Sequence, residues 1–243
     1  MLENKMDLEK ISCLMVTKGN TDSVRYSLKM FQQQTYPVKE MVVVTDPGQM
    51  QRLSNDLNLD NNNNIQFVDS AKCIRNATLG DLRNLAISSA QGEYICQWDD
   101  DDLYHPRRLE IQMGLLKKHS ASVCLLNQWI IWWPIKKRFV ISNKRHWEGS
   151  LLAKKSIMPN YLSLTRGEDT PVVENLIKNH PAVSIKNPYL YIYVVHGNNT
   201  FDEAHFELMY GLAEAKFEGE ICEKFYQKLS ESYLLNNYPI PRN

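Results

Sequence analysis

The chain has 243 residues, which is long for one domain but within the range of a single α/β unit with a sizeable core. Its 28 lysines and arginines balance its 28 aspartates and glutamates, which argues against nucleic acid as the main partner, because nucleic-acid binding usually needs a basic excess. The hydrophobic content of 43% is ordinary for a globular protein, and no apolar run reaches the roughly 20 residues that a transmembrane helix needs.

The five cysteines are scattered and show no C-x-x-C spacing, which indicates neither a disulfide framework nor a zinc site. Cys13, Cys96 and Cys124 lie in apolar runs and are expected to be small core residues. This cysteine usage fits a reducing compartment, and the N-terminal "MLENKMDLEK" has no apolar signal-peptide region. We therefore expect a cytoplasmic protein, with peripheral contact at the cytoplasmic face of the membrane as an open option.

Short apolar runs alternate with helical patterns over the first 126 residues. Buried strands are expected at 11–17, 41–45, 65–68, 93–98 and 122–126. Helices are expected between them, including one capped by Asp22, one over 81–92 that Gly92 ends, and one that begins at Pro106. This alternation predicts an α/β protein with a mainly parallel, Rossmann-like sheet flanked by helices.

The second half of the chain follows a different pattern. Residues 127–142 predict a hairpin that turns at 134–137, and residues 189–201 predict a strand that runs into a polar turn. The last 40 or so residues are expected to be mainly helical and amphipathic. No repeat, linker or domain boundary is evident, so we expect one domain over 1–243 with two halves, 1–126 and 127–243.

Four consecutive aspartates, Asp99–Asp102, follow directly after the fourth expected strand, in "QWDDDDLYHP" (97–106). Ligands of a parallel sheet bind beyond the carboxyl ends of its strands, where Asp46 is also expected. Side chains alternate along an extended segment, so Asp99 and Asp101 would form an Asp-x-Asp unit suited to a hard divalent cation. A solvated acidic turn, or capping of the helix after Pro106, is the alternative.

The segment "EYICQWDDDDLYHPRRLE" (93–110) resembles the corresponding segment of family 2 glycosyltransferases, which have the GT-A fold. Four further segments resemble that family in the same order: "ISCLMVTKGN" (11–20), "QTYPVKEMVVVTD" (34–46), "DLRNLAISSAQGEY" (81–94) and "GEDTPVV" (167–173). One position departs from the pattern, since Val16 stands where the family usually has proline. Asp-x-Asp alone is weak evidence, but five ordered motifs make a strong resemblance.

This resemblance implies a nucleotide-diphospho-sugar donor, with a UDP-sugar favoured, and a glycan or lipid-linked acceptor. It implies Mn²⁺ or Mg²⁺ bound by Asp101, with His196 as a further metal contact, and Asp169 as the base of an inverting reaction. Trp147 and Glu168 are expected on the acceptor side. The donor contacts implied by the resemblance come from Thr17, Asp46, Arg83, Asp99, Asp100 and Asp101.

The resemblance also implies that residues 1–126 bind the nucleotide sugar. Residues 127–243 would then form the acceptor side and the C-terminal helices. Simpler roles stay open for several of these residues. Asp46 fits a turn, Arg83 fits a surface helix charge, and Asp169 with Glu168 fits a helix N-cap. His196 fits a structural role and Trp147 fits the core equally well.

Two other functions compete with sugar transfer to a surface-glycan or glycolipid precursor. A sugar nucleotidyltransferase would show a glycine-rich, basic loop near the N-terminus, whereas "VTKGNTDS" (16–23) has one glycine and one lysine. A degenerate domain could bind nucleotide sugar or partners without catalysis. The presence of both Asp101 and Asp169 argues against that reading.

Overall fold

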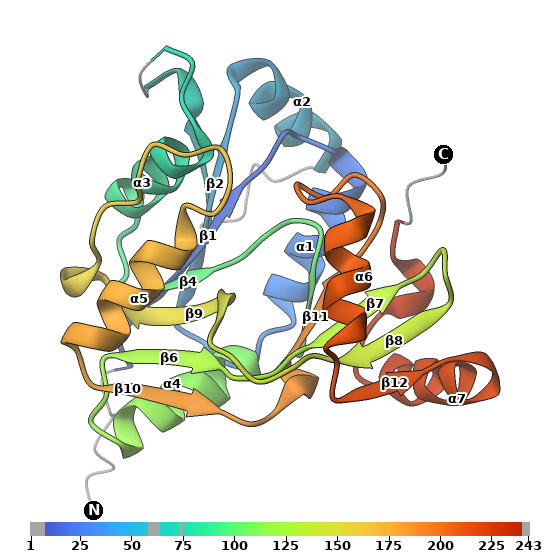
Figure 1. The fold of residues 1–243 in the computed structure, drawn as a ribbon. Coiled ribbons are helices and arrows are strands. Elements are labelled where there is room, and N and C mark those ends of the chain that lie inside the picture. The colour runs from blue at the N-terminus through green and yellow to red at the C-terminus, as the bar shows by residue number, and fades with distance from the viewer. Residues whose placement is uncertain (1–7, 58–63, 73–74, 240–243) are drawn as a thin grey trace, which may run out of the picture.

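A seven-stranded, mainly parallel sheet forms the centre of the protein (Figure 1). The structure, a computed structural model, describes residues 8–57, 64–72 and 75–239. The strands of this sheet are β1 (Ile11–Val16), β2 (Lys39–Thr45), β3 (Ile65–Asp69), β4 (Tyr94–Gln97), β6 (Val123–Leu126), β9 (Trp147–Lys154) and β10 (Ala182–Ile185). Their order is β10–β6–β9–β4–β1–β2–β3, and only β9 runs antiparallel to its neighbours. The five strands expected in the first half are confirmed.

Helices cover both faces of this sheet, as expected. They are α1 (Thr21–Gln32), α2 (Pro47–Leu57), α3 (Leu79–Ser89), α4 (Arg108–Lys118) and α5 (Asp169–Asn179). Two further helices, α6 (Glu203–Gly211) and α7 (Gly219–Ser230), pack against a second sheet. Successive strand side chains point to opposite faces. Cys13 and Met15 therefore share one core with residues of α1, α2 and α4, whereas Leu14 packs with Ala86 of α3. None of the helices in the described part of the chain is long and apolar enough to cross a membrane.

A second, five-stranded sheet lies beside the first and has the order β12–β8–β7–β11–β5. Its strands are β5 (Leu103–Tyr104), β7 (Ile130–Trp133), β8 (Arg138–Ile141), β11 (Tyr191–Val194) and β12 (Ala215–Phe217). The expected hairpin is confirmed as β7 and β8, which pair antiparallel. Because β5 directly follows the four aspartates and pairs with β11, this sheet brings the aspartates to the residues after β11.

Some sequence expectations were wrong in detail. Strands β9 and β10 were missed, and β12 interrupts the C-terminal region that was expected to be helical. Helix α1 is capped by Asn20, whose side chain accepts from the backbone N–H groups of Asp22 and Ser23, so Asp22 lies in the first turn instead. A capping box between Thr78 and Asp81 starts α3 two residues earlier than expected.

Gly92 does not end α3, because that helix stops at Ser89 and Gly92 lacks the left-handed φ of a helix-ending glycine. It serves instead as a point of close approach between the start of β4 and β1. The Gly92 N–H donates to Ser12 Oγ at 2.8 Å. A Cβ at this position would lie 2.6 Å from the carbonyl oxygen of Lys10 and 2.8 Å from the backbone nitrogen of Ser12. Only glycine lets the two strands approach this closely.

Replacing Gly92 with alanine is expected to lower the free energy of unfolding by about 1–3 kcal/mol, because the added Cβ must push β1 away from β4. Denaturant unfolding followed by circular dichroism measures the change. The matched control is Gly114→Ala in α4, where a Cβ would meet no atom of the described residues within 4 Å. That variant should be neutral or gain up to about 1 kcal/mol from helix propensity. Equal unfolding free energies for Gly92→Ala and the wild type would contradict the close approach.

Candidate active site

Several of the predicted site residues follow the carboxyl ends of strands or begin a helix, whereas Arg83 lies within α3 and Trp147 begins β9. Thr17 follows β1, Asp46 follows β2, and the turn Asp99–Asp102 follows β4. His196 lies two residues beyond β11, and Asp169 is the first residue of α5. Ligands of α/β sheets bind at this edge, so the location agrees with the sequence interpretation.

Arg83 joins the aspartate turn to the segment that begins α5. Its Nε donates to Glu168 Oε1 at 2.7 Å, and its Nη2 lies 3.3 Å from Asp99 Oδ1. Both Arg83 and Glu168 are buried, so this is an ion-pair bridge rather than a surface contact. A buried charge that loses its partner is costly, by about 3–5 kcal/mol. Arg83 therefore holds Asp99 and Glu168 at a fixed separation.

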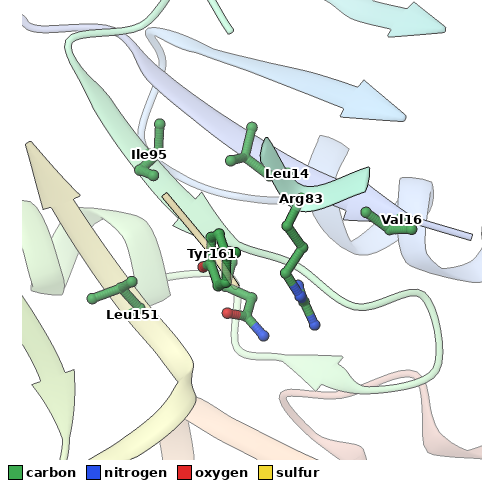
Figure 2. A pocket seen from close by; sticks show the side chains of 7 residues that line it. Leu14, Val16, Arg83, Ile95, Leu151 and Tyr161 are labelled. Carbon is green, nitrogen blue, oxygen red and sulfur yellow. The ribbon is translucent and has the colours of Figure 1, made fainter. Parts of the chain in front are cut away.

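A small cavity of about 10 Å³ lies beside Arg83 (Figure 2). Figure 2 shows the guanidinium of Arg83 pointing away from Ile95, with Tyr161 nearby. The lining residues are Leu14, Val16, Arg83, Ile95, Gln97, Leu151 and Tyr161. A space of this size holds about one water molecule. This cavity is therefore too small for a ligand larger than a water molecule.

Asp100 turns toward β1 rather than toward Arg83. Thr17 Oγ1 donates to Asp100 Oδ2 at 2.5 Å, and it accepts from the N–H of Gly19 at 2.9 Å. Burial and the neighbouring Asp101 raise the pKa of Asp100 to about 7, while the bond from Thr17 opposes the rise. Thr17 and Asp100, both predicted donor contacts, are thus brought together.

Asp101 and His196 also meet, although 95 positions separate them. His196 Nε2 lies 2.9 Å from Asp101 Oδ2, and the Asp101 side chain is 35% exposed. The turn after β11 is held by Asn199, whose side chain accepts from the His196 N–H and donates to the carbonyl of Val194. His196 Nδ1 accepts from the N–H of Asn198 at 3.3 Å, so ligation of a metal by Nε2 would require that contact to change. The pair presents one oxygen and one nitrogen at the open edge of the sheet.

Asp102 is buried and holds the turn to β11. Its carboxylate accepts from the N–H of Val194 at 2.9 Å and from the hydroxyl of Tyr191. Burial raises the pKa of Asp102 well above its usual range. Since Asp102 adjoins Asp101 and Val194 lies two residues before His196, this buried carboxylate fixes the spacing between the two candidate metal ligands.

Asp169 is the best candidate for a catalytic base. Burial raises its pKa to about 6, with contributions from Glu168, Glu148 and Asp99, while Arg83 opposes the rise. A carboxylate with this pKa is mostly ionised at neutral pH but more basic than an ordinary aspartate. Its position at the start of α5 also matches the alternative N-terminal role, although no side-chain capping bond comes from Glu168.

Glu148 was not predicted as a site residue. Its Oε1 accepts from Thr170 Oγ1 at 3.0 Å and pairs with Arg145, and it is buried. It therefore ties β9 to the first turn of α5 beside Asp169. No local sequence pattern indicates this contact, because it depends on β9 lying next to the start of α5.

The two remaining predicted residues differ in exposure. Asp46 is exposed, and its carboxylate accepts from the N–H of Gln49 at 2.9 Å, which supports the first turn of α2. Trp147 is buried, stacks on Trp129 with ring centroids 4.3 Å apart, and donates to the carbonyl of Asn143. Trp129, Trp132 and Trp133 of the hairpin region are buried too, so the tryptophans form part of the core.

The donor atoms of Asp101 and His196 fit a divalent ion such as Mn²⁺, which accepts both carboxylate oxygen and imidazole nitrogen. Mg²⁺ prefers oxygen ligands and would depend mainly on Asp101. Within residues 8–57, 64–72 and 75–239, no group of three or more His, Cys, Asp or Glu side chains is arranged to hold a metal ion. A bound ion would therefore draw most of its remaining ligands from substrate oxygens and water.

Two curated proteins of Bacillus subtilis (strain 168) are similar to part of this chain. EpsE, whose name describes it as a glycosyltransferase, is 30% identical over 113 residues, which are 45% of this chain and 39% of EpsE. The protein CgeD is 27% identical over 107 residues, which are 42% of this chain and 25% of CgeD. The matches therefore span less than half of either relative.

Solved structures share the fold at low identity. TarS 1-349 of S. aureus in complex with UDP matches with a TM-score of 0.60 and 16% identity, covering 83% of this chain and 69% of that chain. The mannosyltransferase PcManGT of Pyrobaculum calidifontis, in complex with GDP-Man and Mn²⁺, matches with a TM-score of 0.58 and 14% identity, covering 81% and 59%. Both likenesses establish the GT-A type of fold.

The family described as Glycosyl transferase family 2 matches residues 12–156, which include β1, the aspartate turn and β9. This match extends over more than half of the chain and includes Thr17, Arg83 and the aspartate turn, whereas Glu168, Asp169 and His196 lie beyond it. The fold and the matched relatives agree with it. The chain therefore belongs to glycosyl transferase family 2.

Proposed function

We propose that this protein is an inverting glycosyltransferase that moves a sugar from a nucleotide-diphospho-sugar to an acceptor hydroxyl. One arrangement supports the proposal most. A pair suited to a metal ion, Asp101 and His196, and a separate half-buried carboxylate, Asp169, lie at the two ends of the Arg83 bridge between Asp99 and Glu168. Transfer of a sugar needs both parts, one for the leaving diphosphate and one for the incoming hydroxyl.

The proposed donor site is the surface of residues 1–126 above the aspartate turn. Asp46 would face the base, Thr17 and Arg83 would lie near the nucleotide, and Asp99 and Asp100 would face the ribose and sugar. The structural neighbours were solved with UDP, UDP-GlcNAc or GDP-Man, which supports a nucleotide sugar without selecting its base. We favour a UDP-sugar as the first donor to test.

A divalent ion held by Asp101 and His196 would stabilise the negative charge that develops on the departing nucleoside diphosphate. The protein's own contribution is to fix these two side chains. Asp102 spaces them, and Arg83 keeps Asp99 away from Asp101 by pairing with it. Four ionised carboxylates in a row would otherwise repel one another and spread apart.

Asp169 would accept the proton of the acceptor hydroxyl as that oxygen attacks the anomeric carbon. The attack comes from the face opposite the leaving diphosphate, so a single displacement inverts the configuration of the anomeric carbon. Inverting glycosidases invert it by the same single displacement. We assign the acceptor side to residues 127–243, with a glycan or lipid-linked precursor as the acceptor. Glu168 and Trp147, which are buried, would shape the wall beside Asp169 rather than contact the acceptor directly.

A thermal-shift panel of UDP-, GDP-, CDP- and dTDP-sugars, each with and without Mn²⁺, tests donor binding. One nucleotide class should raise the melting temperature, and only when Mn²⁺ is present. Asp101→Asn should abolish the metal-dependent shift, whereas His180→Gln, at the far end of α5, should retain it. No response to any donor would contradict the proposed function and favour a degenerate domain.

Asp169→Asn is expected to lower the turnover number by about 10²–10⁴-fold while leaving donor binding nearly unchanged, because the amide cannot accept the proton. Steady-state kinetics with the donor identified by the panel measures this. Glu174→Gln, an exposed change on the same helix, is the matched control and should keep wild-type activity. Wild-type turnover in Asp169→Asn would remove Asp169 from the mechanism.

The pH dependence of kcat/KM should report the raised pKa of Asp169. Because the base must be ionised, the rate should rise with pH through about pH 6, and fall by about tenfold per unit at lower pH. Donor binding measured over the same range separates this loss from loss of the substrate complex. A rate that stays constant from pH 7 down to pH 5 would show that no group of this pKa acts as the base.

A further inference from the structure

The aspartate turn is fastened by a residue from the other end of the described chain. Tyr238 Oη donates to the backbone carbonyl of Asp101 at 2.6 Å, although 137 positions separate the two residues. Tyr238 directly follows the short 3-10 helix η4 (Leu235–Asn237). Both lie beyond residue 156, where the match to the family ends. This contact is therefore made by a part of the chain outside the matched region.

The ring of Tyr238 is held firmly in place. It is buried and packs edge-on against Tyr26 of α1, with ring centroids 5.5 Å apart, and lies equally close to Trp132 of β7. Tyr26 in turn donates its hydroxyl to the carbonyl of Leu234 at 2.6 Å, which fastens the segment to α1. The hydroxyl of Tyr238 therefore points at the aspartate turn because the ring has packing partners from two elements.

The segment lies against α1. A hollow of about 220 Å³ lies along it, lined by Asp22, Arg25, Tyr26, Lys29, Leu234, Asn237 and Pro239. The segment is therefore held both by the burial of Tyr233, Leu235 and Tyr238 in the core and by specific hydrogen bonds. Tyr233, which donates to the carbonyl of Tyr189 at 2.6 Å, anchors its other end.

The other aspartates of the turn are fixed by different groups. Tyr104 Oη accepts from the N–H of Asp99 and donates to its carbonyl, and the carboxylate of Asp102 is held by Val194. Asp101 differs, because its side chain reaches only as far as His196 while its carbonyl is held by Tyr238. The orientation of the peptide after Asp101 is thus set by the tyrosine.

We propose that Tyr238 is a positioning residue for Asp101, and that through it the segment 233–238 sets the affinity of the site for a divalent ion. This inference rests on the proposed role of Asp101 as metal ligand. Ligand positions must be held to within about 0.5 Å for full affinity, and hydrogen-bonding partners behind metal ligands typically contribute about 10–100-fold. Loss of the Tyr238 hydroxyl leaves the ring in place but frees the Asp101 peptide.

Mn²⁺ titration of the full chain, read by electron paramagnetic resonance with UDP and separately with GDP, tests this proposal. Tyr238→Phe should raise the Mn²⁺ concentration needed for half-saturation by about tenfold, while nucleotide binding at saturating Mn²⁺ stays near the wild-type value. The matched control is Tyr226→Phe. It removes a hydroxyl that donates to Asn236 of the same segment, at 2.9 Å, and not to the turn.

The possible results distinguish the metal-binding role of Asp101 from the positioning role of Tyr238. A wild-type protein that binds no Mn²⁺ with either nucleotide overturns the metal role of Asp101 and this inference with it. Mn²⁺ binding by the wild type with an unchanged half-saturation point in Tyr238→Phe overturns the positioning role alone. Equal shifts in Tyr238→Phe and Tyr226→Phe would show that the hydrogen bond from Tyr238 to Asp101 has no specific effect, and would also overturn the positioning role.

Discussion

Mutual repulsion among four adjacent carboxylates is the constraint around which this site is built. The chain resolves it by giving each aspartate a different partner: Arg83 for Asp99, Thr17 for Asp100, His196 for Asp101, and Tyr191 with the Val194 N–H for Asp102. These partners come from α3, the end of β1, and β11 with the residues that follow it. The turn is consequently a point where both sheets and one helix are tied together, and of its four aspartates only Asp102 is fully buried.

The Arg83 bridge connects the aspartate turn to the segment that contains Asp169. By pairing with Glu168 as well as Asp99, the arginine fixes the start of α5 relative to the turn, and its charge limits how far the pKa of Asp169 rises. The residues proposed for donor binding and the residue proposed for proton removal would therefore interact electrostatically through Arg83. This explains why residues that resemble donor and acceptor contacts in the sequence are directly bonded in the structure, and why the buried charges of this unit need one another.

Local signals made part of this arrangement predictable. Apolar runs identified the first-half strands, and the position of Asp99–Asp102 after β4 indicated the candidate site, because parallel strands end at a common edge. Long-range pairing was not predictable. Strand β9 is inserted between β4 and β6, which places Glu148 beside Thr170, and no spacing along the chain encodes that neighbour. The same holds for Tyr238, which reaches Asp101 only because the C-terminal segment folds back over α1. Gly92 was wrongly predicted to end α3, because its close contact with β1 becomes evident only once the strands are paired.

A crystal structure with UDP and Mn²⁺, analysed by anomalous diffraction at the manganese edge, tests the central claim most directly. The account predicts an anomalous peak between the carboxylate of Asp101 and the diphosphate of UDP, with His196 within coordination distance. A nucleotide bound with its diphosphate away from Asp101, or a manganese peak at another set of side chains, would contradict it.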